Sequence, residues 1–129
     1  MILLDTCVLL RLTDGAVLPH HLRHALEQDA WCVSALSAWE ISIKHALGKL
    51  PLDVPPARWW PGVVANLGVT VLPFSDAQAI RAGGLPMLHT DPFDRAIIAT
   101  ALESNLPLAT VDPLFDAYRG PCGLVLAGV

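Results

Sequence analysis

A polar segment that leads into an apolar helix, residues 89–102, constrains the fold of this chain most. The segment reads His-Thr-Asp-Pro-Phe-Asp-Arg and continues with apolar or small residues from 96 to 102. Asp91 is predicted to cap the helix, Pro92 to take its first position and Asp94 to lie in its first turn. Because residues 96–102 offer almost no polar side chain, this helix is expected to be buried.

The two aspartates at the start of this helix allow two interpretations. Asp91 and Asp94 suit a capping role, since both would lie at the positive end of the helix dipole. Two carboxylates at the mouth of a buried helix also resemble half of a metal site. Three other segments of the chain each place one more acid at the end of a predicted element, which favours the second interpretation.

Composition predicts a single domain over residues 1–129 with a substantial core. Hydrophobic residues make up 53% of the chain and charged residues only 16%, which argues against disorder. No apolar run reaches the ~18 residues that cross a bilayer, and the first residues lack the basic start of a signal peptide. Cys7, Cys32 and Cys122 have no zinc-type spacing, so they are expected to be reduced core residues of a cytoplasmic protein without a membrane anchor.

Short apolar runs alternate with helical patterns along the whole chain. The runs predict strands at residues 1–4, 30–33, 69–72, 108–111 and 123–127, and the helical patterns lie at 20–28, 34–48, 63–67, 77–82 and 92–102. Unbroken apolar strands suit a parallel sheet that is covered on both faces. The alternation therefore predicts an α/β fold with a central parallel sheet.

Four acids are predicted to meet at one edge of this sheet. Asp5 and Asp112 follow strands, Glu40 lies in an early turn of its helix, and Asp94 lies in the first turn of another. In a parallel α/β sheet the carboxyl ends of strands and the starts of helices share one edge. Each acid also has an ordinary role: Asp5 and Asp94 as helix starts, Asp112 in a turn, and Glu40 as the i+4 partner of Lys44.

A cluster of carboxylates is a site for a hard divalent cation. Like charges that lie close together repel, and oxygen ligands select Mg²⁺ or Mn²⁺. Such a site activates water and clamps a phosphodiester with one metal ion or two. Thr6 and Thr110 are placed to hydrogen-bond a carboxylate, a water or a phosphate. The chemistry that suits these residues best is metal-assisted phosphodiester hydrolysis.

The charge of the chain gives weaker information about its partners. The net charge is −4, so a basic groove for nucleic acid is not expected unless bound cations offset the acids. Trp59 and Trp60 could stack on bases, but packing at a core edge or in a dimer contact is the better interpretation. His20, His21 and His24 are expected to lie on a solvated helix face, since no acid or cysteine completes a metal site around them.

Several motifs, in order, resemble those of the PIN-domain ribonucleases and, among these, the VapC toxins of VapBC toxin–antitoxin pairs. They are Leu4-Asp5-Thr6, Val33-Ser34-Ala35 with Trp39-Glu40-Ile41 and Lys44, Leu47-Gly48-Lys49-Leu50, Leu85-Pro86 with His89-Thr90-Asp91-Pro92-Phe93-Asp94-Arg95, and the segment 108–115. The resemblance covers essentially the whole chain. The segment 89–95 is its most specific part, whereas a lone aspartate near the start is weak. Residues 11–13, Arg-Leu-Thr, depart from the apolar or aromatic run of similar proteins, which concerns packing or dimerisation.

The resemblance implies a three-layer α/β/α sandwich, Mg²⁺-dependent RNA cleavage and homodimerisation. It also implies inhibition by a cognate antitoxin, which inserts a segment, often with an arginine, into the acidic site. The acidic set of the family corresponds to Asp5, Glu40, Asp94 and Asp112, of which Asp5 and Asp94 match the principal metal ligands. Thr110 matches the hydroxyl residue beside the last acid, and Asp91 belongs to the motif of this branch.

Two other classes of function compete with a ribonuclease. An aspartyl-phosphate phosphatase or phosphotransfer domain would also place an aspartate after the first strand, but Cys7 stands where a dehalogenase-type phosphatase needs a second acid. A receiver domain needs a lysine at a late strand end, and the only lysines are Lys44 and Lys49. A non-catalytic partner-binding module would leave the convergence of acids unexplained. RNA cleavage with and without a chelator distinguishes these classes.

Overall fold

The computed structural model describes residues 1–129 as short strands that alternate with helices. In chain order the elements are β1 (Ile2–Leu4), α1 (Thr6–Asp14), α2 (His20–Glu27), β2 (Trp31–Ser34), α3 (Ala35–Ala46), α4 (Pro56–Leu67), β3 (Thr70–Leu72), α5 (Asp76–Gly84), α6 (Pro92–Ser104), β4 (Leu108–Ala109), the 3-10 helix η1 (Pro113–Tyr118) and α7 (Arg119–Cys122). The α/β alternation predicted from the apolar runs is confirmed.

The four strands form one parallel sheet in the order β3-β2-β1-β4. In its register Leu3 lies opposite Cys32 on one side and Leu108 on the other. Each of these three residues is fully buried, as expected of central strands covered on both faces. The sheet order places the carboxyl ends of β1, β2 and β4 side by side, and this edge carries the acids.

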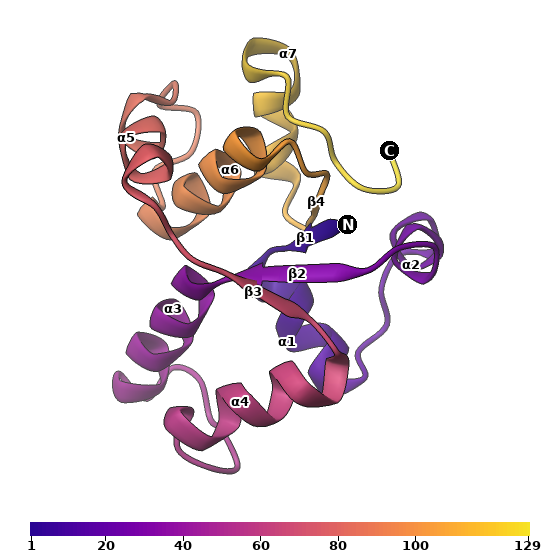
Figure 1. Ribbon diagram of the computed structural model, residues 1–129, viewed down its shortest axis with the longest axis vertical. Helices are drawn as coiled ribbons and strands as arrows, with labels where there is room; N and C mark the ends of the chain where they lie inside the picture. Colours follow the sequence, from indigo (N-terminus) through magenta and orange to yellow (C-terminus); the bar gives the residue numbers. More distant parts are fainter.

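Side chains of each strand alternate between two separate hydrophobic cores. Ile2 and Leu4 point into one core, whereas Leu3 points into the other, because successive side chains of a strand face opposite ways. Helices α1, α2 and α4 cover the first face, and α5, α6, η1 and α7 cover the second (Figure 1). The result is the expected three-layer α/β/α sandwich.

Helix α3 lies between the two layers of helices and joins them. Its Leu36 packs in the core of α5 and α6, and its Ile41 packs in the core of α1 and α4. Glu40 lies one turn after the buried Leu36 on the same side of the helix, and only 3% of its surface is exposed. Burial of an acid on a helix that both cores clamp fixes its position relative to the sheet.

Four side chains cap the elements that begin at the carboxyl edge of the sheet. Asp5 caps α1, Ser34 caps α3, Asp91 caps α6 and Asp112 caps η1, each by accepting a backbone N–H. Caps of this kind satisfy donors that the helix itself leaves free. The edge is therefore held together by hydrogen bonds from the main chain to three carboxylates and one hydroxyl.

The expected strand at residues 123–127 is wrong. This segment makes only a single parallel bridge, between Leu108 and Leu126. Its hydrogen bonds run from the Leu108 N–H to the Val125 carbonyl and from the Ala127 N–H to the Leu108 carbonyl, both 2.9 Å long. β4 has only two residues, so residues 123–127 lie beside a strand that is too short for a full strand pairing.

The extent of the helix predicted at residues 63–67 is also wrong, since α4 begins at Pro56. Proline costs little at a first helical position, where its missing N–H would have had no partner. Pro61 lies inside the helix and removes one hydrogen bond. Trp59 and Trp60 are partly buried against the core of α1, as the core-edge interpretation predicted, and this packing offsets the local signals against a helix.

The cysteines agree with the prediction only in part. Cys32 is buried and Cys122 is partly buried, but Cys7 is exposed on α1, so its assignment to the core was wrong. Its neighbours Thr6 and Val8 are buried, whereas Cys7 itself is accessible to solvent. All three thiols are free. The helices are all too short or too polar to cross a bilayer.

A pair of matched substitutions tests the two-sided core. Ile98 of α6 is fully buried, so Ile98→Ala is expected to lower the free energy of unfolding by about 2–5 kcal/mol. Ile80 of α5 is 76% exposed, and Ile80→Ala is expected to change it by about 0.5 kcal/mol or less. Urea unfolding followed by circular dichroism measures both. Equal losses would show that α6 is not packed as described.

Candidate metal centre

Five carboxylates from four parts of the chain line one cavity at the carboxyl edge of the sheet. The lining comprises Asp5, Thr6, Cys7, Leu10, Glu40, Lys44, Asp91, Asp94 and Asp112. The structure thus brings together all four acids that the sequence predicted to meet, together with Asp91 and Thr6. Lys44 is the only cationic side chain in the lining. The role of the four acids as metal ligands stays a prediction.

Asp5 follows β1 directly and is 3% exposed. Its Oδ1 accepts the backbone N–H of Val8 at 2.7 Å, so the residue caps α1 and faces the cavity at once. The capping role and the site role, which the sequence left as alternatives, are compatible in one geometry. Burial raises the pKa of Asp5 to about 6 despite hydrogen bonds from Thr110 and Val8, and the charges of Glu40 and Asp112 add to the rise.

Glu40 is buried on α3 and only half satisfied. Its Oε2 lies 2.6 Å from the Lys44 ammonium, one turn further along the helix. Its Oε1 is buried and has no hydrogen-bond partner. An unpartnered buried carboxylate oxygen is costly, since it has given up water and gained nothing. The predicted Lys44 pair is therefore present, but it leaves one oxygen of Glu40 available to a cation.

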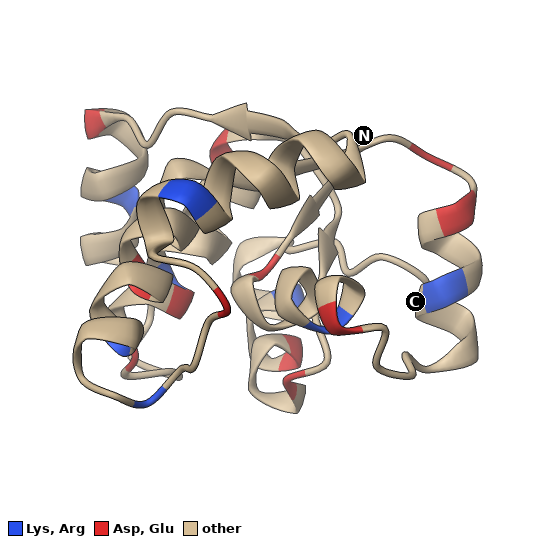
Figure 2. Cartoon of the chain, turned by 90° about the horizontal axis from the view of Figure 1, so that it is seen from below, with Lys and Arg blue, Asp and Glu red and all other residues tan.

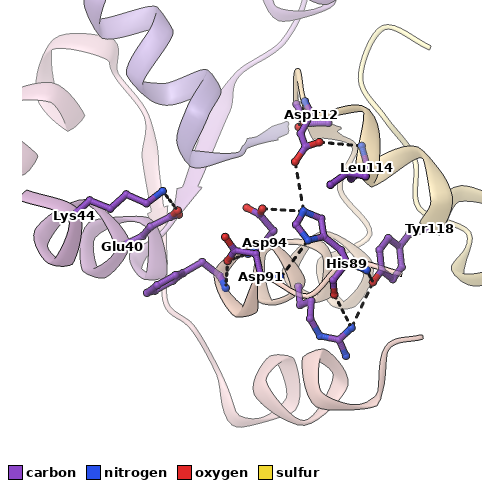
Figure 3. Close-up of polar contacts among 11 residues, drawn as sticks. Glu40, Lys44, His89, Asp91, Asp94, Asp112, Leu114 and Tyr118 are labelled. Carbon is purple, nitrogen blue, oxygen red and sulfur yellow. Dashed lines mark hydrogen bonds and ion pairs between the residues drawn. The ribbon is translucent and has the colours of Figure 1, made fainter. Parts of the chain in front are cut away.

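Asp94 and Asp112 approach each other through the ring of His89 (Figure 3). His89 Nε2 lies 3.0 Å from Asp94 Oδ2 and 3.4 Å from Asp112 Oδ2. Asp112 Oδ1 accepts the Leu114 N–H at 2.9 Å, which caps η1. One ligand atom from each of His89, Asp94 and Asp112 lies within 4.8 Å of the others, a spacing that suits a metal ion.

The acids of the cavity raise one another's proton affinity. Burial raises the pKa of Asp94 to about 7, and the negative charges of Asp91 and Glu40 contribute, whereas His89 opposes the rise. Burial by itself lowers the pKa of Lys44. The hydrogen bond to Glu40 and the negative charges of Glu40, Asp91 and Asp94 outweigh burial, so the pKa of this lysine is raised. Lys44 therefore stays charged, and one ammonium faces five carboxyl groups.

Three residues with supporting roles hold the acids in place. Asp91 Oδ1 accepts the N–H groups of Phe93 and Asp94, so the predicted cap of α6 is confirmed. Thr110 Oγ1 accepts the Asp112 N–H at 3.0 Å and fixes the turn after β4. Thr6 Oγ1 lies 2.9 Å from Ser37 Oγ, a buried contact that ties α1 to α3.

His89 is the site residue to which the sequence had assigned no role. It stands within the segment 89–95, but helical periodicity and capping rules say nothing about a histidine two residues before a cap. Its position depends on contacts with Tyr118 and Arg95, which come together only in the folded chain. The single available signal was its place in the most specific motif of the chain.

Other charged groups form no second site of this kind. His20, His21 and His24 are exposed on α2, as predicted. Lys and Arg lie at scattered positions on several elements in the view of Figure 2. The acidic cavity is therefore the strongest concentration of ionisable groups in the molecule.

A family model described as PIN domain matches residues 2–121, nearly the whole chain. The chain belongs to the PIN domain family. One curated relative, ribonuclease VapC16 of Mycobacterium tuberculosis, is 39% identical to this chain over 62 residues. That alignment covers 46% of this chain and 44% of the relative, so it spans less than half of either protein. The motif resemblance seen in the sequence is thus confirmed at the level of the family.

Two solved structures share the fold of this PIN chain. A toxin–antitoxin complex from Klebsiella pneumoniae matches with a TM-score of 0.64 at 21% identity, over 98% of both chains. A DNA-bound VapBC from Salmonella typhimurium matches with a TM-score of 0.64 at 20% identity, over 97% of this chain and 95% of that chain. At this identity the likeness establishes the α/β/α architecture and its connectivity.

The raised pKa values predict how the stability of the metal-free protein depends on pH. Folding raises the pKa of Asp5 and Asp94 from 3.8 to about 6 and about 7, so the folded state binds these protons more tightly. The free energy of unfolding should therefore fall as pH rises from 4 towards 8. Asp94→Asn removes one interacting charge, and at pH 8 in EDTA it should be more stable than the wild type by on the order of 1 kcal/mol.

Urea titrations at several pH values measure this difference. Asp14→Asn, which changes an exposed acid of α1, is the matched control and should keep the pH dependence of the wild type. If Asp94 acted only as a helix-start residue, Asp94→Asn would instead destabilise the protein by ~0.3–1 kcal/mol at pH 8. Such a loss would contradict the acidic-cluster interpretation.

Proposed function

We propose that this PIN domain is a metal-dependent endoribonuclease, the toxin of a toxin–antitoxin pair, that hydrolyses RNA phosphodiesters. The observation that carries the proposal is the unpartnered Glu40 Oε1, which is buried at a cavity that Asp5, Asp94 and Asp112 also line. A fold does not leave a carboxylate oxygen unsatisfied among other carboxylates without a compensating partner. A divalent cation supplies that partner.

The donor set fits Mg²⁺, with Mn²⁺ as the alternative. Asp5, Glu40, Asp94 and Asp112 would hold the ion, and all offer the hard oxygen ligands that Mg²⁺ prefers. Hydrogen bonds from the main chain fix Asp5 and Asp112, so these carboxylates are positioned before any ion binds. Asp5 and Asp94, whose pKa values are raised to about 6 and about 7, must lose their protons to become ligands. Metal binding should therefore release protons near neutral pH.

A divalent cation held by these residues would supply activation of a water molecule and stabilisation of the charge on the phosphodiester. The residues of the chain supply the rest of the reaction environment. Lys44 is 45% exposed at the same cavity, so its ammonium can reach an RNA phosphate while it keeps its hydrogen bond to Glu40.

An acidic cavity on a chain of net charge −4 also suits a basic inhibitory partner. We infer that a cognate antitoxin places an arginine or lysine near Asp5 and Asp94, and that the toxin is a homodimer in the cytoplasm. The toxin–antitoxin complexes among the solved structures of the same fold support the antitoxin partner. Purification of the native complex tests it, and a partner bound only at surfaces remote from Asp5 would refute inhibition by occlusion of the site.

An aspartyl-phosphate enzyme is the weaker candidate. Asp5 would have to act as a nucleophile, yet it is 3% exposed and its Oδ1 is engaged by the Val8 N–H. Cys7 is exposed at the position of the second acid that a phosphatase of this type requires. No lysine lies at the end of β4, where a receiver domain would need one.

Chelation and two isosteric substitutions test the nuclease. Protein purified away from any partner should cleave RNA in Mg²⁺ and lose this activity in EDTA. Asp5→Asn and Glu40→Gln keep side-chain size but remove the ligand charge, so each should reduce cleavage by more than the ~10–100-fold typical of residues behind the ligands.

Asp14→Asn serves again as the control, because it changes an exposed acid outside the cavity and should leave cleavage at the wild-type rate. Activity that survives exhaustive chelation would falsify the metal-dependent mechanism. Full activity of Glu40→Gln would show that the unpartnered oxygen of Glu40 has no part in it.

A further inference from the structure

The ring of His89 is placed as if it were a third ligand beside Asp94 and Asp112. It is 8% exposed, and its Nε2 is within 3.4 Å of an oxygen from each carboxylate. The Phe115 ring packs edge-on against it, with 5.7 Å between centroids, and prevents the imidazole from turning. By distance alone, His89 could either bind a metal ion or donate a hydrogen bond to the two carboxylates.

The other nitrogen of the ring distinguishes these two roles. His89 Nδ1 lies 3.2 Å from the backbone nitrogen of Asp91, which is a donor and cannot accept. Nδ1 must therefore be the acceptor, and the ring proton lies on Nε2. A histidine that binds a metal through Nε2 carries its proton on Nδ1 and donates it outward. The Asp91 N–H occupies the place where such an acceptor would have to be.

We propose that His89 is a positioning residue of the nuclease site, which holds Asp112 by donating its Nε2 proton to it, packs against Asp94 at the same nitrogen, and does not itself bind the metal ion. The inference rests on the proposed function of the acidic cavity. It assigns a specific task to the first residue of the segment 89–95, to which neither the acid pattern nor the capping pattern had assigned one.

This hydrogen bond determines which carboxylate oxygens remain free for an ion. Both oxygens of Asp112 are engaged, Oδ1 by the Leu114 N–H and Oδ2 by His89. His89 Nε2 also lies 3.0 Å from Oδ2 of Asp94, whereas Oδ1 of Asp94 accepts no hydrogen bond from the protein. Asp94 Oδ1 is thus free of protein hydrogen bonds, as Asp91 Oδ2 and the buried Glu40 Oε1 also are.

The backbone of His89 is held by a buried polar network on the far side of the ring. The hydroxyl of Tyr118 accepts the His89 N–H at 2.9 Å and donates to the Pro86 carbonyl at 2.7 Å. The guanidinium of Arg95 donates to the His89 carbonyl at 3.3 Å and to the carbonyls of Ala82, Leu85 and Pro86. Tyr118 is fully buried and Arg95 is 6% exposed. Such fully satisfied buried networks fix a single geometry.

Nitrogen NMR of histidine-labelled protein reads the tautomer of His89 directly. Comparison with the spectrum of His89→Gln assigns its signals among the five histidines. In metal-free protein the expected result is a protonated Nε2 and a bare Nδ1, and Mg²⁺ should leave both unchanged. Loss of the Nε2 proton when Mg²⁺ is added, or a proton on Nδ1 before it, would overturn the proposal.

A pair of substitutions tests the same role through metal affinity. In His89→Gln the amide nitrogen takes the place of Nε2 and can still donate to the carboxylates, whereas His89→Asn can replace only the Nδ1 acceptor. Mn²⁺ titration should therefore show binding weakened by ~10–100-fold in His89→Asn and largely recovered in His89→Gln. Equal losses in both variants would show that a donor at the Nε2 position does not support metal binding and would overturn the proposal.

Two controls separate this test from the fate of the proposed function. His24→Asn, on the exposed face of α2, should bind Mn²⁺ as the wild type does. Thermal melts in EDTA show whether each variant is folded, including the His89→Gln protein that assigns the NMR signals. If the wild type failed to cleave RNA, the nuclease assignment would fall, while the tautomer and the Mn²⁺ comparison would still decide the role of His89.

Discussion

The hydrogen bonds from helix N–H groups to Asp5, Asp91 and Asp112 are the interactions on which the rest of the structure depends. Each carboxylate caps the element that begins beside it, at distances of 2.7–2.9 Å. Backbone donors and the positive ends of the helices stabilise negative charge where bare carboxylates would repel. Because the main chain positions these acids, the cavity is formed before any cation arrives, which is what a precise metal site requires.

The buried acids lower the stability of the metal-free protein and remain available to bind a cation. Burial of Asp5 and Asp94 raises the pKa of each carboxyl group, so the ionised form that binds a cation is disfavoured in the metal-free protein. Glu40 adds a buried oxygen with no partner. A cation that binds the folded state alone reverses these costs by mass action. The strained electrostatics of the cavity are therefore best understood as a property of the metal-free state.

Local patterns in the sequence were sufficient for most of the fold but only part of the site. The apolar run before Asp5 and the start of α6 at Asp91 carry their own signals, so strands, caps and the shared edge could be predicted. The extent of α4 could not, because burial of Trp59 and Trp60 outweighs Pro61. The strand expected near Leu126 failed because pairing depends on the length of its neighbour. The role of His89 depends on Tyr118 and Asp112, which are distant in sequence and meet only after folding.

The central claim is that the acids at the carboxyl edge form a cation site around the free oxygen of Glu40. Crystals soaked in Mn²⁺ and measured for anomalous scattering locate the ion directly. The predicted result is an anomalous peak in contact with Glu40 Oε1 and Asp94 Oδ1, at the ~2.0–2.2 Å typical of carboxylate ligands. The same peak should be absent from crystals of Glu40→Gln. An ion bound by the ring of His89 through Nε2, or no ion in the acidic cavity at saturating Mn²⁺, would contradict it.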